Sequence, residues 1–195
     1  MKVGITGNIG SGKTTVCKIF ETFGIPIYYA DIEAKKLMSE DINVKEQIKL
    51  LFGLEAYLED GTLDRAYIAN IVFNNPQMLT RLNYIVHPAV KYHSAQWAKN
   101  QKKAPYNLKE AALMIESENH KALDKLIVVS APIDIRVARV MKRDNVEEEA
   151  VMARESKQMP EAEKLKIADY VITNDGKKSL IKQVHRIHNE LLSLI

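Results

Sequence analysis

The sequence has few of the features that mark secreted or membrane proteins. Its 195 residues contain one cysteine, Cys17, so no disulfide can form within the chain, as is usual in a reducing cytoplasm. No stretch approaches the roughly 18 consecutive apolar residues that a membrane-spanning helix requires. The N-terminal residues run directly into a strand pattern, which leaves no room for a signal peptide. We therefore expect a cytoplasmic protein with no membrane partner.

A large excess of charge of one sign is also missing. The chain carries 28 Lys and Arg against 25 Asp and Glu, and its net charge of +3 is too small and too scattered to indicate nucleic-acid binding. Hydrophobic residues make up 46% and charged residues 27%, close to the average for soluble globular proteins. We expect a single domain over residues 1–195, a monomer or weak homo-oligomer, with no nucleic-acid partner.

Glycine is scarce, but half of it lies in one place. The chain has 8 glycines, and four of them occur in GITGNIGSGKTTV, residues 4–16. Residues 7–14 fit the phosphate-loop pattern G-x-x-x-x-G-K-[ST], between a strand pattern and a helical pattern, as that loop requires. Glycines keep Cβ atoms away, so that successive N–H groups converge on phosphate. Lys13 would reach the β- and γ-phosphates and Thr14 would coordinate Mg²⁺. A glycine turn without a ligand is the alternative.

Strand patterns alternate with helical ones along the chain. This alternation predicts a three-layer α/β fold whose parallel sheet has helices on both faces. The five predicted strands are residues 2–6, 25–29, 112–115, 126–130 and 170–173.

Two segments are longer than crossover connections require. The first is read as a helical subdomain over residues 40–110, with Asp64 and Asn75-Pro76 as helix starts. The second, residues 139–166, is highly charged and helical in pattern. The core then consists of residues 1–39, 111–138 and 167–195.

Asp31 follows the apolar run IPIYYA, so it lies at the carboxyl end of a predicted strand, where ligands of open α/β sheets bind. A carboxylate there can accept the proton of an acceptor hydroxyl during phosphoryl transfer. Asp31 also precedes a helical pattern, and Asp is a preferred helix cap. The spacing alone leaves both roles open.

Arg139 and Arg143 are four residues apart in RVARVMKRD and share a helix face. Such a pair can stabilise the charge of a transferring phosphoryl group. The alternative is a solvated helix face with pairs to Asp or Glu.

Several stretches together resemble the dephospho-CoA kinase family, and they span nearly the whole chain. Besides the glycine loop they are YADIEAKKL, DGTLDRAYIANIVFNNPQMLTRLNYIVHPAV, VARVMKRDNVEEEAVMARESKQMP and ADYVITNDG. The resemblance implies a P-loop kinase fold with strand order 2-3-1-4-5, a helical CoA-binding insertion over residues 40–110 and a lid over residues 139–166. It implies transfer of phosphate from ATP, with Mg²⁺, to the ribose 3′-hydroxyl of the small molecule dephospho-CoA, the last step of coenzyme A synthesis.

The resemblance also implies roles for individual residues. Asp31 would be the base, assisted by Lys13, Arg139 and Arg143, and Thr14 would hold the metal. Dephospho-CoA would contact Asp31, His87 and Glu116, where Glu116 matches the acidic end of the third-strand motif. The residues that would bind ATP are Gly10, Ser11, Gly12, Lys13, Thr14, Thr15 and Asn174, the last near the adenine.

The chain departs from the family pattern at Asn8, where a second glycine is usual, and at Tyr29, where an aspartate is usual. Asn tolerates left-handed backbone, so Asn8 is read as a mild change. His87-Pro88 is expected to shape a turn in the helical subdomain.

The sequence leaves two alternative functions to consider. The acceptor could be another small molecule, such as a nucleoside or a nucleoside monophosphate, although the long helical insertion offers more surface than such an acceptor needs. A GTP-binding switch or a regulatory ATPase is disfavoured because the sequence lacks D-x-x-G after a strand and N-K-x-D for guanine.

Overall fold

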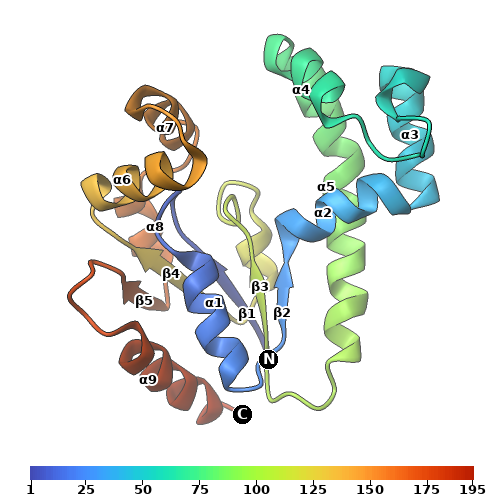
Figure 1. Cartoon of the computed structure of the whole chain (residues 1–195). Helices are drawn as coiled ribbons and strands as arrows, with labels where there is room; N and C mark the ends of the chain where they lie inside the picture. The colour runs from blue at the N-terminus through green and yellow to red at the C-terminus, as the bar shows by residue number, and fades with distance from the viewer. The chain divides into compact units, whose positions relative to one another are not determined.

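The computed structural model describes all 195 residues and contains one parallel sheet of five strands in the order β2-β3-β1-β4-β5 (Figure 1). This confirms the predicted fold class and strand order. Because all strands are parallel, the segments that follow them emerge at the same edge of the sheet. The strands are β1 (Lys2–Thr6), β2 (Ile27–Tyr29), β3 (Asn107–Glu110), β4 (Lys125–Ser130) and β5 (Tyr170–Thr173).

The chain divides into two compact units. The first comprises Met1–Tyr29 and Asn100–Ile195 and contains the sheet. Its helices are α1 (Lys13–Thr22), α6 (Ile133–Asp144), α7 (Glu148–Glu155), α8 (Glu161–Ile167) and α9 (Leu180–Leu192), with a short 3₁₀ turn at Asn119–Ala122. The second unit, Ala30–Lys99, is helical: α2 (Ala30–Glu40), α3 (Ile42–Phe52), the 3₁₀ turn Leu54–Ala56, α4 (Arg65–Asn74) and α5 (Pro76–Asn100).

The side chains of the central strands point alternately to the two faces of the sheet, and each face packs against helices of the first unit. In β4, Ile127 and Val129 are buried in a cluster with apolar residues of α1 and α9, whereas Leu126 and Val128 pack on the other face, with Leu165 of α8. Successive side chains of a strand point to opposite faces, so an almost continuous apolar run can serve both layers. The glycine loop leaves this core between β1 and α1.

The third strand lies elsewhere than expected. Residues 112–115 were predicted to form it, but β3 is Asn107–Glu110, and residues 112–115 form a turn that buries Met114 and Ile115. The sequence NLKE of β3 holds one apolar side chain, Leu108, whose Cα pairs with those of Val3 and Ile27. The apolar residues at 112–115 suggested a strand, but they are buried in a turn, whereas β3 itself contains only one apolar residue.

Two predicted helix starts in the second unit are confirmed. Asp64 caps α4 by accepting a hydrogen bond from the N–H of Tyr67 at 2.9 Å. The Asn75 side chain accepts hydrogen bonds from the first turn of α5. Short polar side chains satisfy N–H groups that a helix leaves unpaired at its start.

The turn expected at His87-Pro88 is wrong, because α5 continues through Pro88 to Asn100. Proline has no N–H and removes one helical hydrogen bond. The buried side chains of Val86 and Val90 anchor the helix on both sides of Pro88. Even this 25-residue helix is not apolar enough to cross a membrane, and the same holds for every other helix.

Candidate active site

The loop between β1 and α1 has a backbone that only glycine fits at two positions. Gly10 and Gly12 have φ angles of 77° and 92°. A Cβ at Gly10 would collide with the backbone carbonyl of Arg136, and one at Gly12 with the side-chain nitrogen of Asn174. The glycines therefore allow a left-handed conformation and a close approach of neighbouring groups at once.

The start of α1 presents the groups that a phosphate requires. Lys13 is the first residue of the helix, and its Nζ donates to the carbonyl of Gly7 at 2.8 Å, so its chain folds back over the loop. Thr14 and Thr15 are exposed in the first turn. The hydroxyl of Ser11 is buried and has no hydrogen-bond partner. The N–H groups that point outward at a helix start, the nearby ammonium and the unpaired hydroxyl of Ser11 together fit a nucleotide phosphate.

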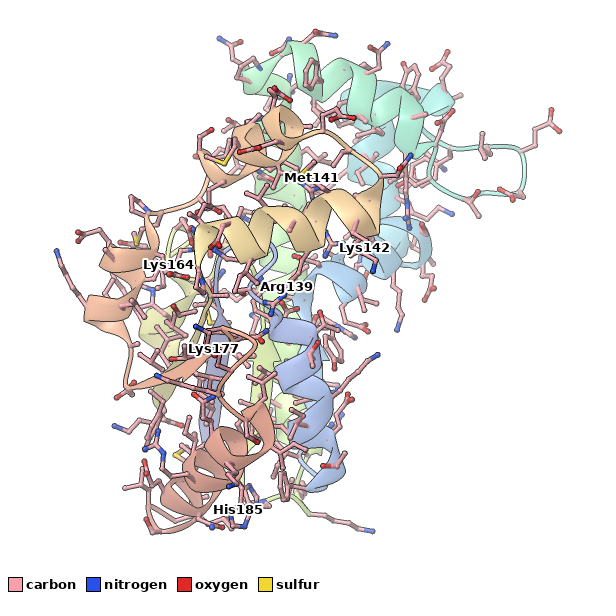
Figure 2. The ribbon with its side chains drawn as sticks, turned by 60° about the vertical axis from the view of Figure 1, so that its left-hand side comes forward. Arg139, Met141, Lys142, Lys164, Lys177 and His185 are labelled. Atoms are coloured by element: carbon pink, nitrogen blue, oxygen red, sulfur yellow. The ribbon has the colours of Figure 1, made fainter.

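Arg139 and Asn174, predicted from separate stretches, meet at this loop. The Asn174 side chain donates to the carbonyl of Ser11 at 2.8 Å. Arg139 donates to the Asn174 carbonyl and side-chain oxygen at 3.1 and 3.2 Å, and to the Gly10 carbonyl at 3.4 Å. Figure 2 shows Arg139 extending from α6 toward the start of α1. These bonds brace one side of the loop.

Arg143 lies apart from this network. Its guanidinium donates twice to its neighbour Asp144, at 2.7 and 3.0 Å, and its side chain is 60% exposed. Asp144 also pairs with Arg154 at 2.8 Å. Hydrogen bonds from both arginines hold the pKa of Asp144 well below its usual range. The helix periodicity placed Arg139 and Arg143 on one side of α6, but only Arg139 contacts the loop.

Glu116 does not end a strand, as expected, but follows the buried turn after β3. Its carboxylate lies 2.9 Å from the ammonium of Lys164, a fully buried residue of α8, and accepts the N–H of Met159 at 2.8 Å. Burial alone would raise the pKa of Glu116, but the ion pair with Lys164 and the hydrogen bond from the N–H of Met159 outweigh it and lower the pKa. Glu116 thus joins two distant segments of the first unit.

Asp31 and His87 belong to the helical unit. Asp31 is exposed and is the second residue of α2, which begins directly after β2, so it lies beyond the capping position and the capping interpretation is wrong. Its carboxylate in the first turn complements the positive end of the helix. His87 is on an exposed part of α5.

Behind the loop, Asn8, Glu155 and Arg136 make contacts that the sequence did not predict. Asn8 is fully buried, and its φ is not positive, so the expected left-handed tolerance is not why Asn is accepted there. Its side chain instead donates to Glu155 at 2.8 Å. Glu155 also receives two hydrogen bonds from Arg136, at 2.6 and 2.9 Å. Arg136 belongs to the arginine-rich stretch RVARVMKRD, but the spacing of that stretch gives no sign that its partner is Glu155.

No group of three or more His, Cys, Asp or Glu side chains converges in a way that could hold a metal ion. Mg²⁺ in nucleotide sites is commonly bound by one or two protein oxygens together with phosphate oxygens and water. Thr14, an exposed residue at the start of α1, can supply one such protein oxygen through its hydroxyl.

Comparisons with known proteins agree with this geometry. The family model of dephospho-CoA kinases matches residues 1–179. A dephospho-CoA kinase of Bacteroides fragilis is 37% identical over 184 residues, covering 94% of this chain and 89% of that protein. One from Salinibacter ruber is 42% identical over 176 residues, covering 89% and 88%.

Solved structures give the same result. The dephospho-CoA kinase from Campylobacter jejuni superposes with a TM-score of 0.74 at 28% identity, covering 99% of this chain and 98% of that one. The protein TT1252 from Thermus thermophilus reaches 0.84 at 36% identity, covering 100% and 97%. Shikimate kinase from Acinetobacter baumannii, at 17% identity and 0.52, covering 99% and 93%, shares the fold.

Proposed function

The chain belongs to the dephospho-CoA kinase family, and from this we propose that it transfers the γ-phosphoryl group of ATP to the ribose 3′-hydroxyl of dephospho-CoA, giving CoA and ADP. The observation that carries the proposal is the family match over residues 1–179, which includes a loop shaped for phosphate. The bond from the γ-phosphorus to the bridging oxygen of ADP breaks, and a bond to the 3′-oxygen forms.

The nucleotide would lie on the loop and the first turn of α1. The Lys13 ammonium donates to the carbonyl oxygen of Gly7 and would donate to phosphate oxygens instead when ATP is bound. Asn174 would lie near the adenine. Mg²⁺, held by Thr14 and the phosphates, would supply positive charge at the β- and γ-phosphoryl oxygens. The remaining residues of the nucleotide set are Gly10, Ser11, Gly12 and Thr15.

The acceptor would be prepared by a carboxylate. Asp31 would accept the proton of the 3′-hydroxyl as the oxygen attacks phosphorus, and His87 and Glu116 are proposed as contacts of dephospho-CoA. Arg139 and Arg143 would stabilise charge on the transferring group. The unit Ala30–Lys99 is the proposed acceptor-binding part, and residues 139–166 are the proposed lid.

The test is ADP release by the purified protein with Mg·ATP, with and without dephospho-CoA, and with adenosine and nucleoside monophosphates as competing acceptors. We expect release to depend on dephospho-CoA, with CoA identified by mass. Lys13→Ala provides the inactive control. ADP release stimulated by a nucleoside or its monophosphate, but not by dephospho-CoA, would overturn the assigned acceptor while leaving the kinase reaction.

A further inference from the structure

Three side chains that are not among the residues proposed to bind ATP meet behind the glycine loop. Asn8 is the second residue of the loop, Arg136 lies on α6, and Glu155 ends α7. Arg136 holds both oxygens of Glu155, at 2.6 and 2.9 Å, and Asn8 Nδ2 donates to the same carboxylate at 2.8 Å. We call these three residues the clasp.

The chain just after α7 adds to the hold on the loop. Asn8 Nδ2 also lies 3.3 Å from the carbonyl oxygen of Met159, to which it donates. The N–H of Ile9 donates to the Gln158 side chain at 2.8 Å, and the carbonyl of Ile9 accepts from Arg136 at 3.3 Å. Both residues that follow Gly7 are therefore fixed by a segment almost 150 residues away in the chain, since Asn8 and Glu155 are 147 residues apart.

The charges of the clasp are balanced and sheltered from water. Arg136 is 4% exposed, and the Glu155 side chain 16%. Burial alone would raise the pKa of Glu155, but the hydrogen bonds from Arg136 and Asn8 outweigh it, so the pKa is lowered and the carboxylate stays ionised at neutral pH. Hydrogen bonds to charged groups are the strong class, and they are stronger still when water is excluded.

A phosphate loop rich in glycine loses much conformational entropy when it adopts one shape. Contacts that impose this shape before the ligand arrives strengthen binding, because less order must be created on binding. We propose that Asn8, Glu155 and Arg136 are positioning residues that hold the first half of the loop in its nucleotide-binding shape by joining it to the end of α7. The inference rests on the proposed function only in taking ATP as the ligand of the loop.

The experiment measures ATP affinity by titration calorimetry with Mg²⁺ and no acceptor, on the full chain and on Asn8→Ala, Glu155→Gln and the double variant. We expect Asn8→Ala to raise the Kd for ATP about tenfold, the effect of one lost hydrogen bond to a charged group. The fold increase in Kd for the double variant should be smaller than the product of the fold increases of the two single variants, because each substitution breaks the same contact between Asn8 and Glu155. The KM for ATP should rise in parallel, while the KM for dephospho-CoA should not.

Glu190→Gln is the matched control, because it removes a carboxylate from an ion pair of 2.9 Å with Arg186 on α9, away from the loop. Its Kd for ATP should equal that of the parent. A folded Asn8→Ala protein whose Kd changes by less than about twofold, whatever its melting temperature, would overturn the proposal. If Glu155→Gln does not fold, Asn8→Ala and Asn8→Gly decide.

The clasp and the reaction can fail separately. If the parent binds ATP but does not phosphorylate dephospho-CoA, the proposed acceptor is wrong, whereas the ATP affinities of the variants still test the clasp. If dephospho-CoA is phosphorylated and Asn8→Ala keeps the parent affinity for ATP, the clasp is wrong and the reaction stands.

Discussion

At the scale of single residues, a carboxylate can take a proton that an amide of the same size cannot. Asp31→Asn should therefore lower kcat by about 100-fold or more, the usual contribution of a general base. The Kd for ATP should stay near that of the parent, because Asp31 is not among the residues of the phosphate loop. Turnover with dephospho-CoA and calorimetric titration with ATP check the two halves of this prediction.

Glu33 offers a matched control for Asp31, since both are acidic residues in the first turn of α2. Glu33 pairs with Lys36 at 2.8 Å, so Glu33→Gln removes a charge of the same helix end without removing the proposed base. It should turn over at a rate close to the parent. If Asp31→Asn did so as well, Asp31 would serve only to complement the helix end.

Single residues were predictable where chemistry and spacing are local. Gly10, Gly12 and Lys13 lie within four positions of one another, and the pattern that joins them follows from phosphate geometry alone. Asn8 was identified as unusual but explained wrongly, because its partner Glu155 is far along the chain. No local rule connects two positions that only the folded sheet brings together.

At the scale of elements, two of the three arginines of α6 differ in their contacts. Arg139 is half-buried and makes three hydrogen bonds to Gly10 and Asn174, whereas Arg143 is exposed and bonds to its neighbour Asp144. Without any nucleotide, Arg139→Ala should lower the free energy of unfolding by about 1–2 kcal/mol, because it leaves acceptors of the loop unpaired.

Arg143→Ala is the comparison on the same helix. It should change the free energy of unfolding by less than about 0.5 kcal/mol, as is usual for exposed ion pairs. Urea unfolding of both variants in the absence of ATP measures the difference. An equal loss in the two variants would mean that Arg139 does not brace the apo loop.

Elements were predictable where one physical preference dominated. The first and fifth strands have the predicted bounds, and α4 and α5 begin at their capping residues. The third strand was displaced because apolarity is shared by strands and by the buried turn at residues 112–115. The sequence predicts a turn at Pro88, but α5 continues through it because burial on both sides of Pro88 outweighs one lost hydrogen bond.

At the scale of the whole molecule, two sheltered ion pairs join different elements of the first unit. Arg136–Glu155 links α6 to α7, and Lys164–Glu116 links α8 to the turn after β3; Lys164 is labelled in Figure 2. Both carboxylates have a lowered pKa in the folded chain. Their contribution to stability is therefore present above the ordinary pKa of 4.5 and is lost as the pH falls below it.

Variants of the Lys164–Glu116 pair can separate the contribution of the ion pair to the free energy of unfolding from that of packing. Lys164→Met alone leaves Glu116 half-sheltered without its cation and should destabilise the protein by about 3 kcal/mol at pH 7. The double variant Lys164→Met/Glu116→Gln holds neither charge, so it should recover part of that loss. It should also lose less stability than the parent as the pH falls from about 5 to about 3, through the range in which a carboxylate with a lowered pKa takes up its proton. Urea unfolding at pH 7 and across this range gives both quantities. A double variant whose stability falls with pH as steeply as that of the parent would show that the acid sensitivity arises elsewhere, with Glu155 the next carboxylate to replace.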